Sequence, residues 1–287
     1  MAMKPAGPTP TEFQIACMTY TYAAFPLQRA LEGIARAGYR YVAWGTTHNE
    51  ASAAKVPVMD AAAPASAAKE LGRRCRDLGL EPVMMFAVGY VEAPDSIKAH
   101  TRRIEQAAAG GVPFVLTFGH TQKESREIWV RNLKEIGPIA RAAGVMIVIK
   151  QHGGTSATGK KCISILTEVA DENVQMCYDA GNNFYYGDDP IADIQLCRDS
   201  IRAFCIKDLR LHPRREPCGP GLGEVDHYQL LGTVAHTGKK IPLSCETLWA
   251  PLLPRPDRPE EIDALARRAR EFLELATRGV QAATVPG

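Results

Sequence analysis

The sequence lacks the features that mark several large classes of protein. No apolar run approaches the about 18 residues that a membrane-spanning helix needs. The first eleven residues are rich in Pro and Ala and lack the apolar centre of a signal peptide. The net charge is only +2, and basic residues cluster in nothing longer than pairs such as Arg73-Arg74. We therefore expect a cytoplasmic protein that acts on neither a membrane nor a nucleic acid.

Paired cysteine spacing is also missing. The chain has eight cysteines but no CxxC pair, and several of them lie inside apolar, strand-like runs. Buried free thiols in a reducing compartment explain this placement better than disulfides or a zinc site built on cysteine. We therefore predict eight unpaired thiols.

What the sequence has instead is one alternation that repeats from end to end. Short apolar runs occur at Phe13–Tyr20, Tyr39–Trp44, Pro82–Val88, Phe114–Phe118, Val145–Ile149, Val174–Tyr178, Ile201–Ile206 and Ile241–Cys245. Stretches with helical periodicity lie between them, at Leu27–Arg36, Ala65–Leu78, Asp95–Ala109, Arg126–Ala143, Lys160–Ala170, Ile191–Asp199, Tyr228–His236 and Pro259–Thr277. Glycine ends many of these helices, as expected for a residue that tolerates the left-handed conformation.

Eight strand–helix units with strands apolar on both faces indicate a parallel sheet covered by helices. Eight units in this length fit an α/β fold, the (β/α)8 TIM barrel of typically ~250 residues. An open, doubly wound sheet is the alternative, but Thr19–Phe25 contains no glycine-rich phosphate loop. No linker demands a second domain, so we expect residues 13–287 to form one barrel domain after a short extension, residues 1–12.

In such a barrel the active site lies at the C-terminal ends of the strands. Ionisable groups are costly to bury unless they are paired, so a ring of them at one mouth predicts a functional site. The polar and aromatic residues at the expected strand ends are Thr19, Tyr20, Tyr22, Trp44, Thr46, Thr47, His48, His120, Lys150, Gln151, His152, Asp179, Asn182, Asn183, Lys207, Asp208, Glu246 and Trp249.

Four segments resemble one known family. They are CYDAGNNFYYGDDP (Cys177–Pro190), CIKDLR (Cys205–Arg210), GLGEVDHYQLL (Gly221–Leu231) and IPLSCET (Ile241–Thr247), and KQHGG also occurs in one branch of it. As an ordered set they are similar to the second half of the xylose-isomerase-like sugar phosphate isomerases and epimerases. The resemblance implies a TIM barrel. It also implies a divalent metal, held by Glu, Asp, His and Glu after strands five to eight, which binds adjacent hydroxyl and carbonyl oxygens of a sugar.

The chain matches that metal shell at two of its four positions. Asp179 corresponds to the Asp and Glu246 to the last Glu, but Lys150 stands where the first Glu belongs and Cys205 where the His belongs. A lysine ammonium has no lone pair and repels Mg²⁺ or Mn²⁺. We therefore expect Lys150 to supply the positive charge itself, paired with Asp179 and Glu246, with Cys205 an ordinary buried thiol.

Two other interpretations of this mouth stay open. A neutral Lys150 forming a Schiff base would need a strongly lowered pKa, which nearby carboxylates oppose. A metal could also be held by Asp179 and Glu246 with other donors in the same mouth; these donors are Gln151, His152, His120 and Asn182. We expect no tightly bound catalytic metal. A three-zinc endonuclease, known from a distant branch of the family, needs more histidines than these strand ends offer.

The resulting functional expectation is an enzyme that abstracts a proton next to the carbonyl of a sugar or keto-sugar. Isomerisation, epimerisation or elimination would follow, with His152 and Glu246 as candidate bases and Lys150 and Lys207 as electrophiles. Candidate substrate-binding residues are Trp44, His48, His120, Asn182, Tyr185 and Trp249, although rim packing explains the aromatic ones equally well. The alternative is a non-catalytic sugar-binding barrel that has lost the metal site. In either case the expected partner is a small carbohydrate, and a homo-oligomer stays open.

Overall fold

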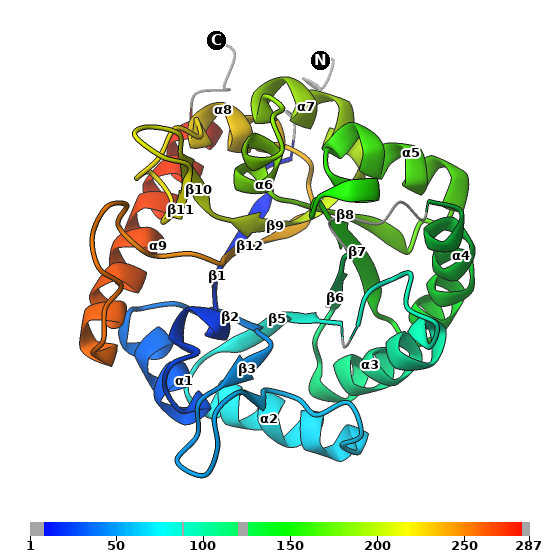
Figure 1. The fold of residues 1–287 in the computed structure, drawn as a ribbon, viewed down its shortest axis with the longest axis horizontal. Helices are drawn as coiled ribbons and strands as arrows, with labels where there is room; N and C mark the ends of the chain where they lie inside the picture. Colours follow the sequence, from blue (N-terminus) through cyan, green and yellow to red (C-terminus); the bar gives the residue numbers. More distant parts are fainter. Residues whose placement is uncertain (1–8, 88, 120–125, 283–287) are drawn as a thin grey trace, which may run out of the picture.

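The computed structural model describes residues 9–87, 89–119 and 126–282, and it contains a closed barrel of eight parallel strands (Figure 1). Around the barrel the strands follow the order β1-β12-β9-β8-β7-β6-β5-β2, and β1 pairs with both β12 and β2. The TIM barrel is therefore confirmed, and the open-sheet alternative is wrong. The barrel strands are β1 (Glu12–Met18), β2 (Tyr41–Trp44), β5 (Glu81–Phe86), β6 (Phe114–Thr117), β7 (Met146–Lys150), β8 (Val174–Tyr178), β9 (Ile201–Ile206) and β12 (Lys240–Cys245).

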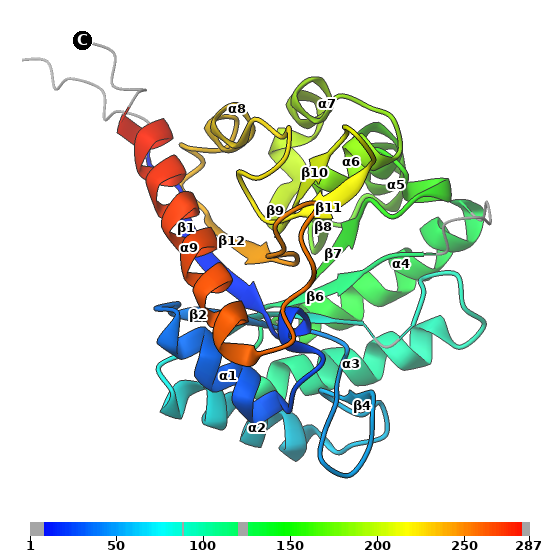
Figure 2. The same cartoon turned by 60° about the vertical axis from the view of Figure 1, so that its left-hand side comes forward.

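A ring of helices covers the outside of the barrel (Figure 1). They are α1 (Leu27–Arg36), α2 (Ala65–Asp77), α3 (Ser96–Gly110), α4 (Arg126–Ala142), α5 (Gly159–Val169), α7 (Pro190–Cys197), α8 (His227–Gly232) and α9 (Pro259–Ala282). The short helix α6 (Ala180–Tyr185) lies inside this ring, at the end of β8 (Figure 1). The last helix is the longest, and it runs along β1 and α1, as Figure 2 shows. Most boundaries agree with the periodicity of the sequence within a few residues.

The sequence prediction was wrong in detail over the late helices. The helix expected to reach His236 ends at Gly232 in α8, because the β-branched pair Thr233-Val234 follows and the backbone tightens into i→i+3 turns. The helix expected to reach Asp199 ends at Cys197 and continues as a single 3₁₀ turn. The short helix α6 and two small hairpins, β3 (Thr47–His48) with β4 (Val56–Pro57) and β10 (Asp208–Arg210) with β11 (Glu216–Cys218), were not predicted.

Apolar residues fill two separate cores. One lies between the sheet and the helices. The other fills the barrel interior and consists of Met18, Ala43, Met84, Leu116, Val148, Cys177, Ala203 and Cys205. Because side chains alternate across a strand, Lys150 points to the same side as the interior residue Val148, and Lys207 follows Cys205 in the same way. The strand geometry thus directs both lysines over the barrel axis.

The barrel begins slightly earlier than predicted. Strand β1 starts at Glu12, one residue before the expected boundary, and Thr11 already bonds to the barrel through its backbone N–H to Ala235 O (2.9 Å) and its hydroxyl to Val234 O (2.5 Å). Residues 1–8 of the expected extension lie outside the described residues. None of the helices in the described part of the chain has both the length and the apolar character needed to cross a membrane.

All eight cysteines are free and buried, as predicted. They lie in strands or within helices, and burial raises the pKa of Cys245, for example, to about 12. We therefore expect a thiol reagent such as Ellman's reagent to detect very few thiols in the native protein and nearly all eight after denaturation without reductant. A clear shortfall in the denatured sample would contradict this prediction.

Candidate functional site

Four charged side chains meet at the C-terminal ends of four neighbouring strands. Lys150 is the last residue of β7. Asp179 directly follows β8, Lys207 follows β9 and Glu246 follows β12. Asp179 also begins helix α6, where its Oδ1 accepts the backbone N–H of Asn182 at 2.9 Å. Parallel strands end at one edge of the barrel, so these positions bring the four side chains together as predicted.

The four residues, called here the four-charge cluster, form a closed set of ion pairs. Lys150 Nζ lies 2.6 Å from Glu246 Oε2 and 3.1 Å from Asp179 Oδ2. Lys207 Nζ lies 3.2 Å from Asp179 Oδ2 and 3.9 Å from Glu246 Oε1. Each ammonium therefore touches both carboxylates, and the cluster is neutral in total. The side chains of Lys150 and Asp179 are almost fully buried, whereas Lys207 and Glu246 remain 11% and 17% exposed.

The pairing decides the protonation states of the cluster. Burial raises the pKa of the Glu246 carboxyl, but the charges of Lys150 and Lys207 outweigh burial and lower this pKa to about 2. Burial acts to lower the pKa of Lys150, but the carboxylates of Glu246 and Asp179 outweigh it, and the pKa of Lys150 is raised. Lys150 is thus an ammonium at neutral pH, which favours its electrostatic role over the Schiff-base alternative.

The donor atoms near the cluster do not fit a divalent metal. One oxygen each of Asp179 and Glu246 and the Sγ of Cys205 lie within 4.8 Å of one another, at three of the four ligand positions that the resemblance implied. However, the Lys150 ammonium lies within hydrogen-bonding distance of the same carboxylates, and it can only repel a cation there. Burial also raises the pKa of Cys205, so this residue is a thiol rather than a metal-binding thiolate.

A test with chelator follows from this donor set. We expect dialysis against EDTA to leave the thermal stability of the wild-type protein unchanged, because no divalent cation is needed between Asp179 and Glu246. The variant Lys150→Glu restores the carboxylate of the family pattern and adds a third negative charge. It should be less stable than Lys150→Met in chelator and should gain stability when Mn²⁺ is added. Loss of wild-type stability in EDTA and its recovery with Mn²⁺ would show that other ligands hold a metal here.

His152 lies beside the cluster in a neutral form. Its Nδ1 donates a hydrogen bond to Gly119 O at 3.0 Å, so Nε2 is the nitrogen that stays unprotonated in the neutral ring. The ring packs on Phe118, with the centroids 4.4 Å apart. Burial, followed by the charges of Lys150 and Lys207, lowers the pKa of His152 below its ordinary 6.5. His152 is therefore a free base at neutral pH.

Two buried amides hold the ends of β7 and β8 in place. Gln151 Oε1 accepts the backbone N–H of Asp179 at 2.9 Å, and Asn182 donates from its side chain to Gln151 O at 2.6 Å. These bonds fix the Asp179 backbone and therefore the direction of its carboxylate. Asn182 was predicted to contact substrate; the structure places it in this supporting network.

A cavity of about 380 Å³ opens beside the two more exposed members of the cluster. Lys207 and Glu246 form one side of it, and Tyr20, Trp249 and Arg255 lie among its other walls. The Arg255 guanidinium stacks over the Trp249 ring, 5.5 Å from the centroid. Trp249 thus lies at the cavity as expected. Arg255 was missed, because it belongs to an irregular loop after β12 that carries no strand or helix periodicity.

The other predicted substrate contacts are spread over the molecule. Trp44 is 1% exposed and packs in the outer core, away from the four-charge cluster. His48 is buried in the β3–β4 hairpin, where its Nδ1 donates to Phe25 O at 2.8 Å. Tyr185 is half-exposed on α6, edge-on to Tyr186. His120 lies outside the described residues.

Asp208, the residue after Lys207, organises the loop that borders the cavity. Its carboxylate accepts backbone N–H groups from Leu209, Gly221, Gly223 and Val225 at 2.8–3.0 Å, and it is fully buried. This carboxylate thereby fixes residues 209–225, including the cavity residue Pro217. It is a structural neighbour of the cluster rather than a member of it.

We expect Asp208→Ala to lower the free energy of unfolding by about 2 kcal/mol or more, since it leaves buried N–H groups without an acceptor. Urea unfolding would measure this change. Asp199→Ala is a matched control, because Asp199 is almost fully exposed and its removal should change stability little. Equal stability of the two variants would contradict the role assigned to Asp208.

Comparisons with known proteins agree with this architecture. Inosose dehydratase from Clostridium botulinum (strain Alaska E43 / Type E3) is 29% identical over 92 residues, which are 32% of this chain and 31% of that protein. The match thus spans less than a third of the relative's length. A solved L-ribulose 3-epimerase is similar with a TM-score of 0.70 at 18% identity, covering 94% of this chain and 96% of that one.

A xylose isomerase-like TIM barrel protein from Mycobacterium smegmatis, solved in complex with magnesium, has a TM-score of 0.71 at 16% identity over 97% of this chain and all of that one. At such identities these two structures establish likeness of fold. The family model described as Xylose isomerase-like TIM barrel matches residues 31–274, which is most of the chain. The chain therefore belongs to the xylose isomerase-like TIM barrel family.

Proposed function

We propose that the chain is an enzyme that abstracts a proton next to the carbonyl of a sugar or keto-sugar. The observation that carries this proposal is the four-charge cluster, two ammonium groups and two carboxylates held at the barrel mouth beside a cavity. Such a cluster is costly to assemble in a buried place, and a pure binding site for a neutral sugar has little need of it. The inosose dehydratase and epimerase relatives support the same reaction class.

The cations act on the carbonyl oxygen. Proton abstraction from the neighbouring carbon moves an electron pair onto that oxygen, and a fixed ammonium stabilises the resulting enolate. Lys207 is the ammonium that faces the cavity, so we assign it the contact with the oxygen. Lys150 is 2% exposed and lies behind Lys207. Its ammonium neutralises Asp179 and Glu246, which leaves the Lys207 ammonium able to contact the substrate oxygen.

His152 is the residue best suited to take the proton. A general base works best when its pKa lies near the operating pH, and Nε2 of His152 is unprotonated at neutral pH. Glu246, the other candidate base, has a pKa of about 2 and accepts a hydrogen bond from the Lys150 ammonium at 2.6 Å, so it is a weak base in this arrangement. Delivery of a proton to the opposite face of the same carbon gives epimerisation. Delivery to the former carbonyl carbon, with the proton of the neighbouring hydroxyl passing to the enolate oxygen, gives isomerisation. Departure of a β-hydroxyl, which takes up a proton and leaves as water, gives elimination.

Solvent exchange tests this proposal without knowledge of the natural substrate. The protein is incubated in D₂O with a panel of ketoses and inososes, and proton NMR follows the loss of the C–H signal next to the carbonyl. We expect exchange on at least one member, together with isomer or dehydration product, and no exchange with Lys207→Met. The sugar-binding alternative, which the two lost metal-ligand positions favour, predicts saturable binding of a sugar with no exchange above the uncatalysed rate.

A further inference from the structure

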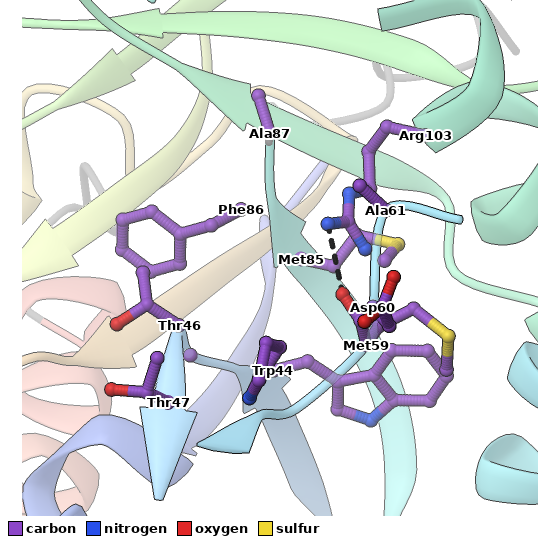
Figure 3. Close-up of a pocket in the computed structure, with 12 residues that line it drawn as sticks. Trp44, Thr46, Thr47, Met59, Asp60, Ala61, Met85, Phe86, Ala87 and Arg103 are labelled. Carbon is purple, nitrogen blue, oxygen red and sulfur yellow. Dashed lines mark hydrogen bonds between the residues drawn. The ribbon is translucent and has the colours of Figure 1, made fainter. Parts of the chain in front are cut away.

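A second cavity lies on the opposite side of the barrel mouth from the four-charge cluster. Its volume is about 310 Å³, at the lower end of the range typical of small-molecule sites. It is formed at the C-terminal ends of β2 and β5, which are opposite β8 and β9 in the strand order. Figure 3 shows its largely apolar walls, among them Trp44, Met59, Met85 and Phe86.

One cation lies in this apolar wall. Arg103 reaches from α3 and is 6% exposed, and its Nη2 donates to Met59 O at 3.1 Å (Figure 3). Within residues 9–87, 89–119 and 126–282, no carboxylate lies within 4 Å of the guanidinium, and Nε has no hydrogen-bond partner. Burial lowers the pKa of Arg103 to about 10, so the group is still charged at neutral pH. A buried guanidinium without a carboxylate is unusual, because burying a charge is costly unless it is paired.

The nearest acidic side chain only partly offsets this charge. Asp60 also lines the cavity, but it is exposed, and its Oδ1 accepts the backbone N–H of Ala62 at 2.7 Å. One guanidinium with a distant, solvated carboxylate leaves less than one net positive charge. Such a site suits a singly charged anion better than a doubly charged phosphate.

The hydrogen bond from Arg103 to the loop of residues 59–63 does not explain why this position carries a charge. The neutral side chain of Gln106, one turn further along α3, donates to Asp60 O at 2.8 Å and to Ala63 O at 2.9 Å. Arg102 donates to Ala63 O as well, at 3.0 Å. The loop of residues 59–63 is thus fixed to α3 by several bonds, and for the single bond from Arg103 to Met59 O a neutral donor would suffice.

We propose that this second cavity binds a small monocarboxylate with an apolar body. The carboxylate pairs with the N–H groups of Arg103 that face the cavity, in the fork geometry that guanidinium and carboxylate share. The apolar body rests on Met59, Met85 and Trp44. The site is independent of the reaction proposed for the four-charge cluster, and neither idea requires the other.

Calorimetric titration with benzoate tests the charge requirement. We expect saturable binding of benzoate to the full-length protein, with the neutral isostere benzamide and the dianion phenylphosphonate each at least about tenfold weaker. Benzamide binding as tightly as benzoate would overturn the proposal, since the cavity would then select shape alone. Tighter binding of phenylphosphonate, or no benzoate binding, would overturn it as well.

Two variants separate the charge from the support of the loop. Arg103→Gln should weaken benzoate binding by about tenfold or more, whereas Gln106→Leu, which loosens the same loop without changing its charge, should change binding less than about threefold. Equal losses in both would make Arg103 a loop support only. Lys207→Met should bind benzoate as the wild type does; a loss there would place the ligand at the four-charge cluster and overturn the proposal.

A direct readout on the wild type avoids any variant that fails to fold. With ¹³C-methyl methionine labelling, the signals of Met59 and Met85 should shift as benzoate is added, because both line the cavity. Met18, in the barrel interior, is the internal control, and its signal should not shift. Shifts of Met18 without shifts of Met59 and Met85 would overturn the assignment.

Discussion

Replacing Lys150 with methionine is expected to lower the free energy of unfolding by about 3–5 kcal/mol at neutral pH. Methionine keeps much of the volume and deletes the charge. It leaves Asp179, which is fully buried, and Glu246 facing each other with only Lys207 to neutralise both, at 3.2 and 3.9 Å. Urea unfolding measures the change. Lys134→Met, at an exposed position of α4, is the control and should change stability little.

The pH dependence of this variant carries a second signature. In the wild type the pKa of Glu246 is about 2, below its ordinary value, so Glu246 contributes stability above about pH 4.5, and this contribution is lost as the pH falls toward 2. Without Lys150 the two carboxylates repel each other, so the pKa of at least one rises, and its protonation relieves the repulsion. The stability difference between wild type and variant should therefore shrink as the pH falls. A difference that is independent of pH would contradict the ion-pair explanation.

Replacing His152 with asparagine is expected to lower the exchange or turnover rate by about 10²–10⁴-fold, the usual contribution of a general base. The asparagine amide can keep the hydrogen bond that Nδ1 donates to Gly119 O, while it removes the free Nε2. The free energy of unfolding should therefore stay close to the wild-type value. His212→Asn, at an exposed loop histidine, is the matched control and should leave the rate unchanged.

The pH profile of the wild type checks the same assignment. Burial lowers the pKa of His152 below 6.5, and the base works only when it is unprotonated. The rate should therefore fall only below pH 6.5, and this acidic limb should disappear in His152→Asn. A His152→Asn variant with a normal rate would exclude His152 as the base and return the role to Glu246, despite the low pKa of that carboxyl.

Local sequence patterns were enough to predict the fold and the positions of the charged residues at the barrel mouth. Apolar runs of five to eight residues followed by amphipathic helices and glycine stops are short-range signals, and they predicted all eight barrel strands within a few residues. The rule that parallel strands end at one edge then placed Lys150, Asp179, Lys207 and Glu246 together. The prediction from sequence periodicity failed for α8, where β-branched residues end the helix early. It also failed for the two hairpins, whose strands are only two or three residues long.

Which side chains share a cavity could not be predicted from the sequence, because it depends on the packing of distant segments. Trp44 follows the interior residue Ala43 and so points outward, but a strand that is apolar on both faces gives no sign of which face is inside. Arg255 and Tyr20 line the same cavity as Lys207 although they are far from it in the sequence, and Arg255 lies in an irregular loop without periodicity. In the sequence, Arg103 looks like an ordinary basic residue of an amphipathic helix. In the structure, packing against the barrel buries its guanidinium and leaves it without a carboxylate partner. Such contacts depend on how distant segments pack in three dimensions, which local sequence patterns do not encode.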